Sequence, residues 1–207
     1  MKLYFLSVLA LIILSCETET KKNEGDTFVP KVTKVETLFD KTSFGDEQKY
    51  ALLAETRICQ PFYSDTMPEG VVPCTPEYFE FYTYNHKRDL EDAFMLQVKA
   101  GVNDFPFRRL LIFTREKGEL VLVNGIIGYL VEKRSRPNEI DDLVVAVFDN
   151  LGNGNFDRYD VLIRYEDGKY HFVEAIGDLY GTFKTEELKK RASKMIKERI
   201  EEKKLIF

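Results

Sequence analysis

The sequence predicts an α+β fold in which a largely antiparallel β-sheet of about six to eight strands packs against helices. Several short segments alternate apolar and polar residues and are separated by turn sequences such as Asp167 followed by Gly168, which is typical of antiparallel hairpins. The chain after Thr185 instead places apolar residues at helical spacing. No repeat of about 20 to 50 residues is visible, which excludes solenoids and propellers.

The first 16 residues are typical of an export signal. Lys2 precedes an apolar run over residues 3–14, which is shorter than the roughly 20 residues that cross a bilayer as a helix. The ending over residues 13–16 (ILSC) resembles the lipobox of bacterial lipoproteins, although Leu14 is larger than the residue usual there. This resemblance implies cleavage before Cys16 and a covalent diacylglycerol lipid on its thiol. The alternative is an ordinary cleaved signal that contains a cysteine.

The signal defines the predicted organisation of the chain. Residues 1–15 are the signal peptide, and residues 16–34 form a polar, charge-alternating tether that begins with the lipidated cysteine. Residues 35–207 form a single globular domain, because a mature chain of about 190 residues suits one core. We therefore expect a protein of the cell envelope, anchored by lipid in the outer membrane or at the cell surface.

The charge distribution limits the partners. A formal net charge of −5 argues against nucleic acid. Residues 184–204 are an exception, since they contain nine basic and five acidic side chains. A basic helix of this kind either docks its apolar stripe on the sheet, with Lys and Arg in solvent, or rests on an anionic membrane.

The individual elements follow from local patterns. Residues 46–58 start with a good N-cap residue, Asp46, and have helical spacing. Gly125 and Gly128 mark bends or bulges in a strand region. Strands are predicted over residues 77–84, 93–99, 109–115, 119–124, 126–134, 143–148, 161–165 and 169–173. Thr185 is the predicted N-cap of the last helix, whose apolar stripe consists of Leu188, Ala192, Met195, Ile196 and Ile200.

Residues 77–84 (EYFEFYTY) carry aromatic rings on both faces of one predicted strand. One face belongs to the core. The other face is either a wet binding surface or is covered by a second layer. That second face consists of Tyr78, Glu80, Tyr82 and Tyr84.

Cys59 and Cys74 are an even pair once Cys16 carries lipid, and they are predicted to form a disulfide bond in an oxidising compartment. Such a bond closes a loop of about 15 residues and stabilises the fold by about 3 kcal/mol. The alternative is two separate buried thiols.

Residues 149–160 (DNLGNGNFDRYD) resemble the calcium loops of EF-hands and dockerins. Oxygen-bearing side chains occupy the first, fifth, seventh, ninth and twelfth positions, and Gly154 occupies the sixth, where the loop turns sharply. Leu151 departs from the pattern, and an aspartate replaces the usual final glutamate. The alternative is a tight hairpin turn, for which Asn and Gly are preferred. The resemblance implies calcium bound by the side chains of Asp149, Asn153, Asp157 and Asp160 and by the backbone carbonyl of Asn155.

The sequence contains no HExxH, GxSxG or Ser-x-x-Lys motif. We therefore expect a lipid-anchored envelope protein that acts as a binding or structural module and is stabilised by calcium. Its expected partners are the membrane, through the anchor, and an envelope or extracellular protein or glycan. The alternative is an enzyme acting on envelope polymers, with carboxylates such as Asp141 and Asp142 as acid and base.

Overall fold

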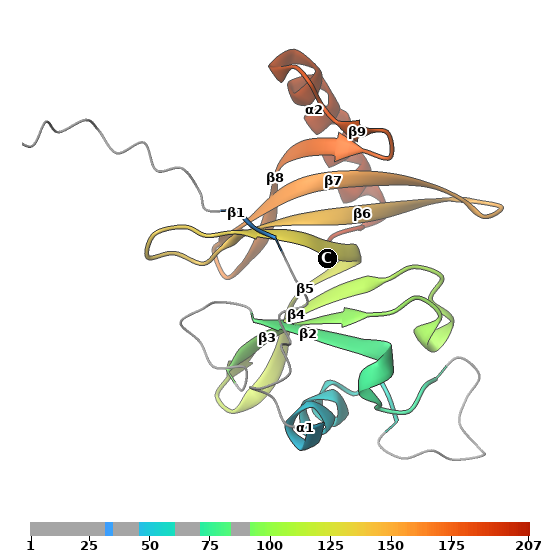
Figure 1. The fold of residues 1–207 in the computed structure, drawn as a ribbon, viewed down its shortest axis with the longest axis vertical. Helices are drawn as coiled ribbons and strands as arrows, with labels where there is room; N and C mark the ends of the chain where they lie inside the picture. The colour runs from blue at the N-terminus through green and yellow to red at the C-terminus, as the bar shows by residue number, and fades with distance from the viewer. Residues whose placement is uncertain (1–31, 35–45, 61–70, 84–91) are drawn as a thin grey trace, which may run out of the picture.

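The computed structural model describes residues 32–34, 46–60, 71–83 and 92–207. In these residues the chain forms one nine-stranded antiparallel sheet with two α-helices, which confirms the predicted α+β class. Helix α1 (Asp46–Thr56) lies at one end of the molecule and α2 (Glu186–Lys203) at the other (Figure 1). The strands are β1 (Val32–Lys34), β2 (Phe79–Thr83), β3 (Ala93–Val98), β4 (Arg109–Glu116), β5 (Glu119–Arg134), β6 (Asp142–Gly152), β7 (Asn155–Glu166), β8 (Lys169–Asp178) and β9 (Gly181–Thr182).

Strands β2 to β9 neighbour one another in chain order, so the sheet is a meander. The last three residues of the predicted tether form β1, which joins the sheet by pairing with β5. The hairpins predicted at residues 116–118 and 167–168 are confirmed. The backbone at hairpin tips has positive φ angles, which favour Gly, Asn and Asp. Three hairpins turn on a residue pair in which both φ angles are positive: Lys117 with Gly118, Asn153 with Gly154, and Asp167 with Gly168.

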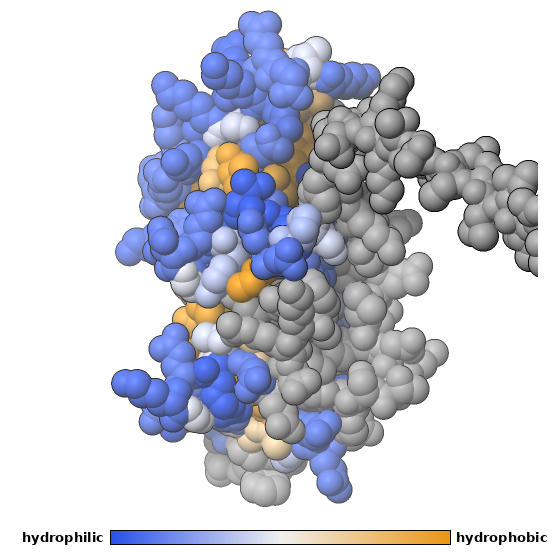
Figure 2. All heavy atoms as spheres, turned by 90° about the vertical axis from the view of Figure 1, so that its left-hand side faces the viewer, coloured by the Kyte–Doolittle hydropathy of each residue, from blue (hydrophilic) through white to orange (hydrophobic). Residues whose placement is uncertain are grey.

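Apolar side chains form two clusters on opposite faces of the β2–β4 part of the sheet. The smaller lies against α1 and includes Leu53 of the helix and Leu96 of β3. The larger includes Met95 of β3, Val145 of β6 and Ile200 of α2. Because side chains alternate along a strand, β3 serves both clusters. On the side drawn in Figure 2, hydrophilic residues cover most of the described surface, and the hydrophobic areas between them are small.

On the second face of the aromatic strand Tyr82 is buried, as the second-layer alternative predicted, and Glu80 is half-buried. The prediction is wrong for Tyr78, which ends a 3-10 turn before the strand and packs against the smaller cluster. Phe79 and Phe81 of β2 belong to the smaller cluster, whereas Tyr82 belongs to the larger one. The Tyr82 hydroxyl donates to Glu80 Oε2 at 2.8 Å, and burial, followed by this carboxylate, raises the pKa of Tyr82. Tyr84 lies outside the described residues.

Cys59 and Cys74 form the predicted disulfide bond, so the alternative of two separate thiols is excluded. Both residues are buried in the smaller cluster. The same two segments are also joined by a backbone hydrogen bond of 2.8 Å from Cys74 N to Gln60 O. The disulfide bond and this hydrogen bond therefore fix the segment after α1 to the segment before β2.

Strand β5 has neighbours along both edges. One edge pairs with β4 as far as Ile127 and with β1 from Glu132 onward. The other edge pairs with residues 205–207 and then, from Gly128, with β6. The predicted bend points are sites of close approach, because a Cβ on Gly128 would lie 1.8 Å from Ala146 O.

A buried amide fills the gap that β4 and β1 leave on the first edge of β5. Gln97 of β3 donates from Nε2 to the carbonyl oxygens of Arg109 and Gly128, at 3.0 Å each. Its Oε1 accepts from Leu130 N at 3.3 Å. The side chain therefore satisfies two backbone groups of β5 that have no strand opposite them.

A second amide joins β5 to the start of β8, which is not its neighbour in the sheet. Asn124 donates from Nδ2 to Tyr170 O at 3.2 Å and accepts at Oδ1 from Tyr170 N at 2.7 Å. The Tyr170 hydroxyl in turn donates to Asp141 O at 3.0 Å. These bonds hold the curled sheet together across the larger cluster.

Helix α2 begins where predicted, since Thr185 Oγ1 accepts from Leu188 N at 3.2 Å. Ile196 and Ile200 are buried in the larger cluster, but Leu188 and Met195 are exposed. The sheet therefore buries only part of the predicted apolar stripe. The reason is that consecutive helical residues differ by about 100°, so Met195 and Leu188 lie on a flank beside the docked face.

We expect Gln97→Leu to lower the free energy of unfolding by about 2–4 kcal/mol, because Gly128 O and Leu130 N lose their partner and each buried orphan costs about 1–3 kcal/mol. Urea denaturation measures this loss. Gln48→Leu on the exposed side of α1 is the control and should change stability by less than about 0.5 kcal/mol. A loss under about 1 kcal/mol for Gln97→Leu would contradict the bridging role.

Candidate functional site

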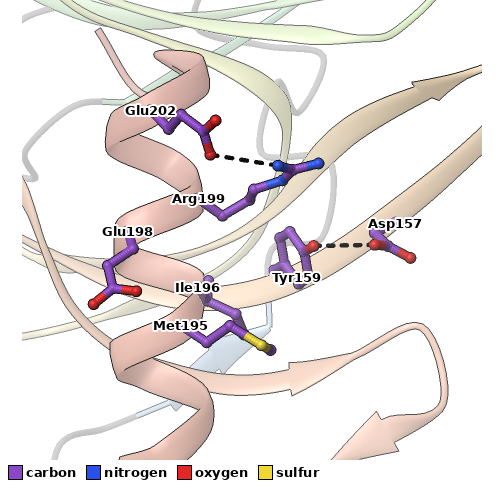
Figure 3. Close-up of a pocket in the computed structure, with 7 residues that line it drawn as sticks. All are labelled: Asp157, Tyr159, Met195, Ile196, Glu198, Arg199 and Glu202. Carbon is purple, nitrogen blue, oxygen red and sulfur yellow. Dashed lines mark hydrogen bonds and ion pairs between the residues drawn. The ribbon is translucent and has the colours of Figure 1, made fainter.

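A pocket of about 420 Å³ opens between β7 and the second half of α2 (Figure 3). Alternation along β7 turns Asp157 and Tyr159 to the helix side of the sheet. The helical lining residues recur every three or four positions, so they share one flank of α2. The helix contributes Met195, Ile196, Glu198, Arg199 and Glu202.

The pocket combines carboxylates with a tyrosine. The Tyr159 hydroxyl donates to Asp157 Oδ2 at 3.1 Å, and Arg199 Nη1 donates to Glu202 Oε2 at 3.4 Å. Burial is the main cause that raises the pKa of Tyr159 to about 12, and the neighbouring Asp157 charge adds to it. The phenol is therefore a hydrogen-bond donor throughout the physiological pH range.

The pocket residue Arg199 is paired with a buried carboxylate, Asp149 of β6, whose side chain is 0% exposed. Arg199 Nε lies 2.5 Å from Oδ2, and Lys203 Nζ lies 2.5 Å from Oδ1. The hydrogen bond to Asp149 is the main cause that raises the pKa of Arg199. Lys203 also donates to Asn150 O at 3.1 Å. One carboxylate thus fastens the last turns of α2 to the β6–β7 hairpin.

The residues of the predicted calcium loop lie in this hairpin and are divided between its two faces. Asp149 pairs across the ladder with Asp157 on the α2 side. Asp160 is directed to the other face, where Arg158 binds both of its oxygens at 2.9 Å. Asn153 is in the turn and Asn155 begins β7, and both are exposed.

The hairpin alternative accounts for the turn, because Asn153 and Gly154 both have positive φ angles. In the described part of the chain, no group of three or more His, Cys, Asp or Glu residues is arranged to hold a metal ion. A calcium ion would have to replace the Arg and Lys partners of Asp149 and the Arg158 partner of Asp160. Calcium binding stays a prediction, which melting temperatures in calcium and in chelator can test.

The opposite face of the hairpin carries an aromatic cluster. The centroid of the Phe148 ring in β6 lies 5.4 Å from the ring centroid of Phe107, 5.5 Å from that of Phe156 and 5.8 Å from that of Tyr129. Arg158 lies over the Tyr129 ring at 5.5 Å. The cluster joins the segment before β4 to the β6–β7 hairpin.

Sequence reasoning named only part of this region. It identified Asp149 and Asp157 but missed Tyr159, Arg199 and Glu202. The signal for the ion pairs was the spacing of Arg199 and Lys203, which lie four residues apart beside the apolar stripe. Cys16, the predicted lipid site, lies outside the described residues.

Comparison with known proteins gave no match. No protein-family model matches the chain, and searches of curated proteins and of solved structures found no significant similarity.

We expect the two sides of the buried ion pair to respond unequally to substitution. Asp149→Asn should lower the free energy of unfolding by about 1–3 kcal/mol, because Arg199 and Lys203 are 35% and 28% exposed and can reach water. The double variant Arg199→Met with Lys203→Met should cost about 3–5 kcal/mol, since it leaves Asp149 buried without a cation. Urea denaturation compares the variants.

The control for this comparison is the exposed pair on the same helix, Lys197 with Glu201, at 3.8 Å. Lys197→Met should change stability by less than about 0.5 kcal/mol. A double variant that loses less stability than Asp149→Asn contradicts the fastening role of the carboxylate. Adding Asp149→Asn to the double variant should recover part of its loss, because the uncompensated charge is removed.

The raised pKa of Tyr159 predicts a loss of stability in alkali. In the unfolded chain a tyrosine ionises near pH 10, whereas Tyr159 in the fold keeps its proton to about pH 12. Between these values the unfolded chain binds fewer protons, so stability falls as pH rises. Tyr159→Phe should make the fall shallower in denaturation series from pH 9 to 11. Tyr180→Phe, at a 92% exposed residue, should leave the slope unchanged, and an equal slope for both variants would overturn this assignment.

Proposed function

We propose that the protein is an exported, lipid-anchored component of the cell envelope and that its folded domain acts as a binding or structural module. The observation that carries the proposal is the disulfide bond between Cys59 and Cys74. Structural disulfides persist in oxidising compartments outside the cytosol, which agrees with an export signal. The third cysteine, Cys16, ends the apolar N-terminal run and is then the residue left for the lipid.

In this proposal the lipid on Cys16 is the anchor. None of the helices in the described residues is long and apolar enough to cross a bilayer. A single acyl chain gives only marginal attachment, whereas the diacylglycerol of the resemblance supplies two chains and stable attachment.

The pocket between β7 and α2 is the best candidate for contact with a ligand. Three of its seven lining residues are carboxylates, Asp157, Glu198 and Glu202, and its one cation, Arg199, is bound to Asp149. Met195 and Ile196 supply apolar contacts. This combination favours a positively charged group on an aliphatic stem, such as a lysine side chain of an envelope protein.

The ion pairs support a binding or structural role over the enzyme alternative. Asp142 accepts from Arg164 at 2.8 and 3.0 Å, and Asp141 lies 3.4 Å from Lys133 Nζ. In the pocket, Asp157 and Glu202 each accept from a neighbouring side chain. An acid or base would first have to leave these partners to reach a substrate proton.

We expect cells supplied with an alkyne fatty-acid analogue to label the protein at Cys16. Cys16→Ala should abolish the label and release the chain from the membrane fraction. The variant Cys59→Ala with Cys74→Ala is the control for acylation of other thiols and should keep its label. An unlabelled protein, or equal labelling of Cys16→Ala, contradicts the lipid anchor.

A further inference from the structure

The turn between β8 and β9 differs in chemistry from the other tight turns of the sheet. Leu179 and Tyr180 occupy its two central positions, between the paired residues Asp178 and Gly181. The turns on positive φ angles use Lys-Gly, Asn-Gly and Asp-Gly at the corresponding places. Leu and Tyr are not among the residues that favour tight turns, and this turn is stabilised by Asp178, whose Oδ1 accepts from Tyr180 N at 2.8 Å. Here Leu179 is 50% exposed and Tyr180 is 92% exposed.

The first half of α2 adds apolar surface at the same end of the molecule (Figure 1). Leu188, in this half, is 54% exposed, and Met195, at the boundary with the pocket that it also lines, is 62% exposed. Residues 188, 191 and 195 are three, four and seven positions apart, so Leu188, Arg191 and Met195 share one flank of the helix. Leu188 and Met195 are the part of the predicted apolar stripe that the sheet leaves uncovered.

Exposed basic side chains occur in the same stretch of the chain. Lys184, Lys190, Arg191 and Lys194 are exposed, and no ion pair joins any of them to another described residue. Lys189 differs, because it pairs with Glu174 at 2.8 Å. The acidic residues at this end are Glu186 and Glu187 in the first turn of the helix and Asp178 beside the hairpin tip, so the charges outside the Lys189–Glu174 pair sum to +1. The whole chain, by contrast, has a formal charge of −5.

We propose that the β8–β9 turn and the first half of α2 form a membrane-contact tip for an anionic lipid surface, and this inference rests on the proposed lipid anchor. The rest of the acidic chain is repelled by anionic headgroups, so the basic end is the one turned toward them. Leu179 and Tyr180 then enter the interface, where tyrosine is favoured because its ring is apolar and its hydroxyl is polar.

The chain contains no tryptophan, so a single introduced indole reports on the tip without background. The full-length protein carrying Tyr180→Trp is reconstituted into vesicles of phosphatidylglycerol with phosphatidylcholine, and into phosphatidylcholine alone. We expect a blue shift of indole emission and quenching by brominated lipids in the anionic vesicles only. High salt should reverse both signals, because the attraction is electrostatic.

Leu151→Trp is the matched control, since Leu151 is 49% exposed beside another hairpin turn, away from the tip. Its emission should be the same in both vesicle types. In the Tyr180→Trp protein, Lys190→Glu with Arg191→Glu should weaken contact of the tip with anionic vesicles at least about tenfold, read as loss of the blue shift, because each basic residue near such a surface contributes about fivefold. The same charge reversal at Lys117 and Lys169, which are exposed at other turns, should not weaken this contact.

The lipid anchor and the tip can fail separately. The intact mass of the same preparation shows whether Cys16 carries lipid, and lipidated chains remain on both vesicle types. A lipidated chain without an indole shift overturns the tip and leaves the anchor intact. A blue shift of indole emission that appears without vesicles and grows with protein concentration indicates that a second copy of the chain covers the surface. This result also overturns the proposal. Equal shifts for Tyr180→Trp and Leu151→Trp would do the same.

Discussion

The hydrogen-bonding capacity of β5 is the constraint on which the rest of the fold depends. A strand in the middle of a sheet must pair along both edges, and unpaired buried backbone groups are costly. No single neighbour runs the full length of β5. Five parts of the chain share its edges: β4, β1, β6, the C-terminal residues 205–207 and the side chain of Gln97. The fold therefore links distant regions through one strand, and the tail is part of the sheet.

The position of α2 follows from the same constraint. The residues that follow the helix, 205–207, are held on β5, with Gly125 N donating to Phe207 O at 2.7 Å. One turn earlier, Arg199 and Lys203 bind the buried Asp149 of β6. Ile196 and Ile200 add apolar contact with the larger cluster. The second half of the helix lines the pocket and is tied to β5 and β6. The first half is tied to β8, where Ser193 Oγ accepts from Ala175 N at 2.9 Å and Lys189 pairs with Glu174, while Leu188 remains exposed.

The parts of the fold that sequence could predict are those set by local chemistry. Alternation and turn pairs such as Asp167 with Gly168 defined the hairpins, and Thr185 defined the start of the last helix. The failures concern contacts between distant residues. The partners of Asp149 come 50 and 54 residues later, and the bonds of Gln97 to β5 span 31 and 33 residues. A twelve-residue pattern cannot reveal that a carboxylate is already neutralised by a distant helix.

The division of α2 also explains why one short chain can present two opposite chemistries. The pocket flank carries Glu198 and Glu202 beside Asp157, so it favours cations. The other end of the helix carries Lys190 and Lys194, and the β8–β9 turn with the exposed Tyr180 lies at the same end of the molecule. This end therefore favours the surface of an anionic membrane. If the basic end faces the membrane, the helix axis directs the acidic pocket away from it. The pocket is then open to the space where an envelope partner would lie, and anionic lipid would not compete for it.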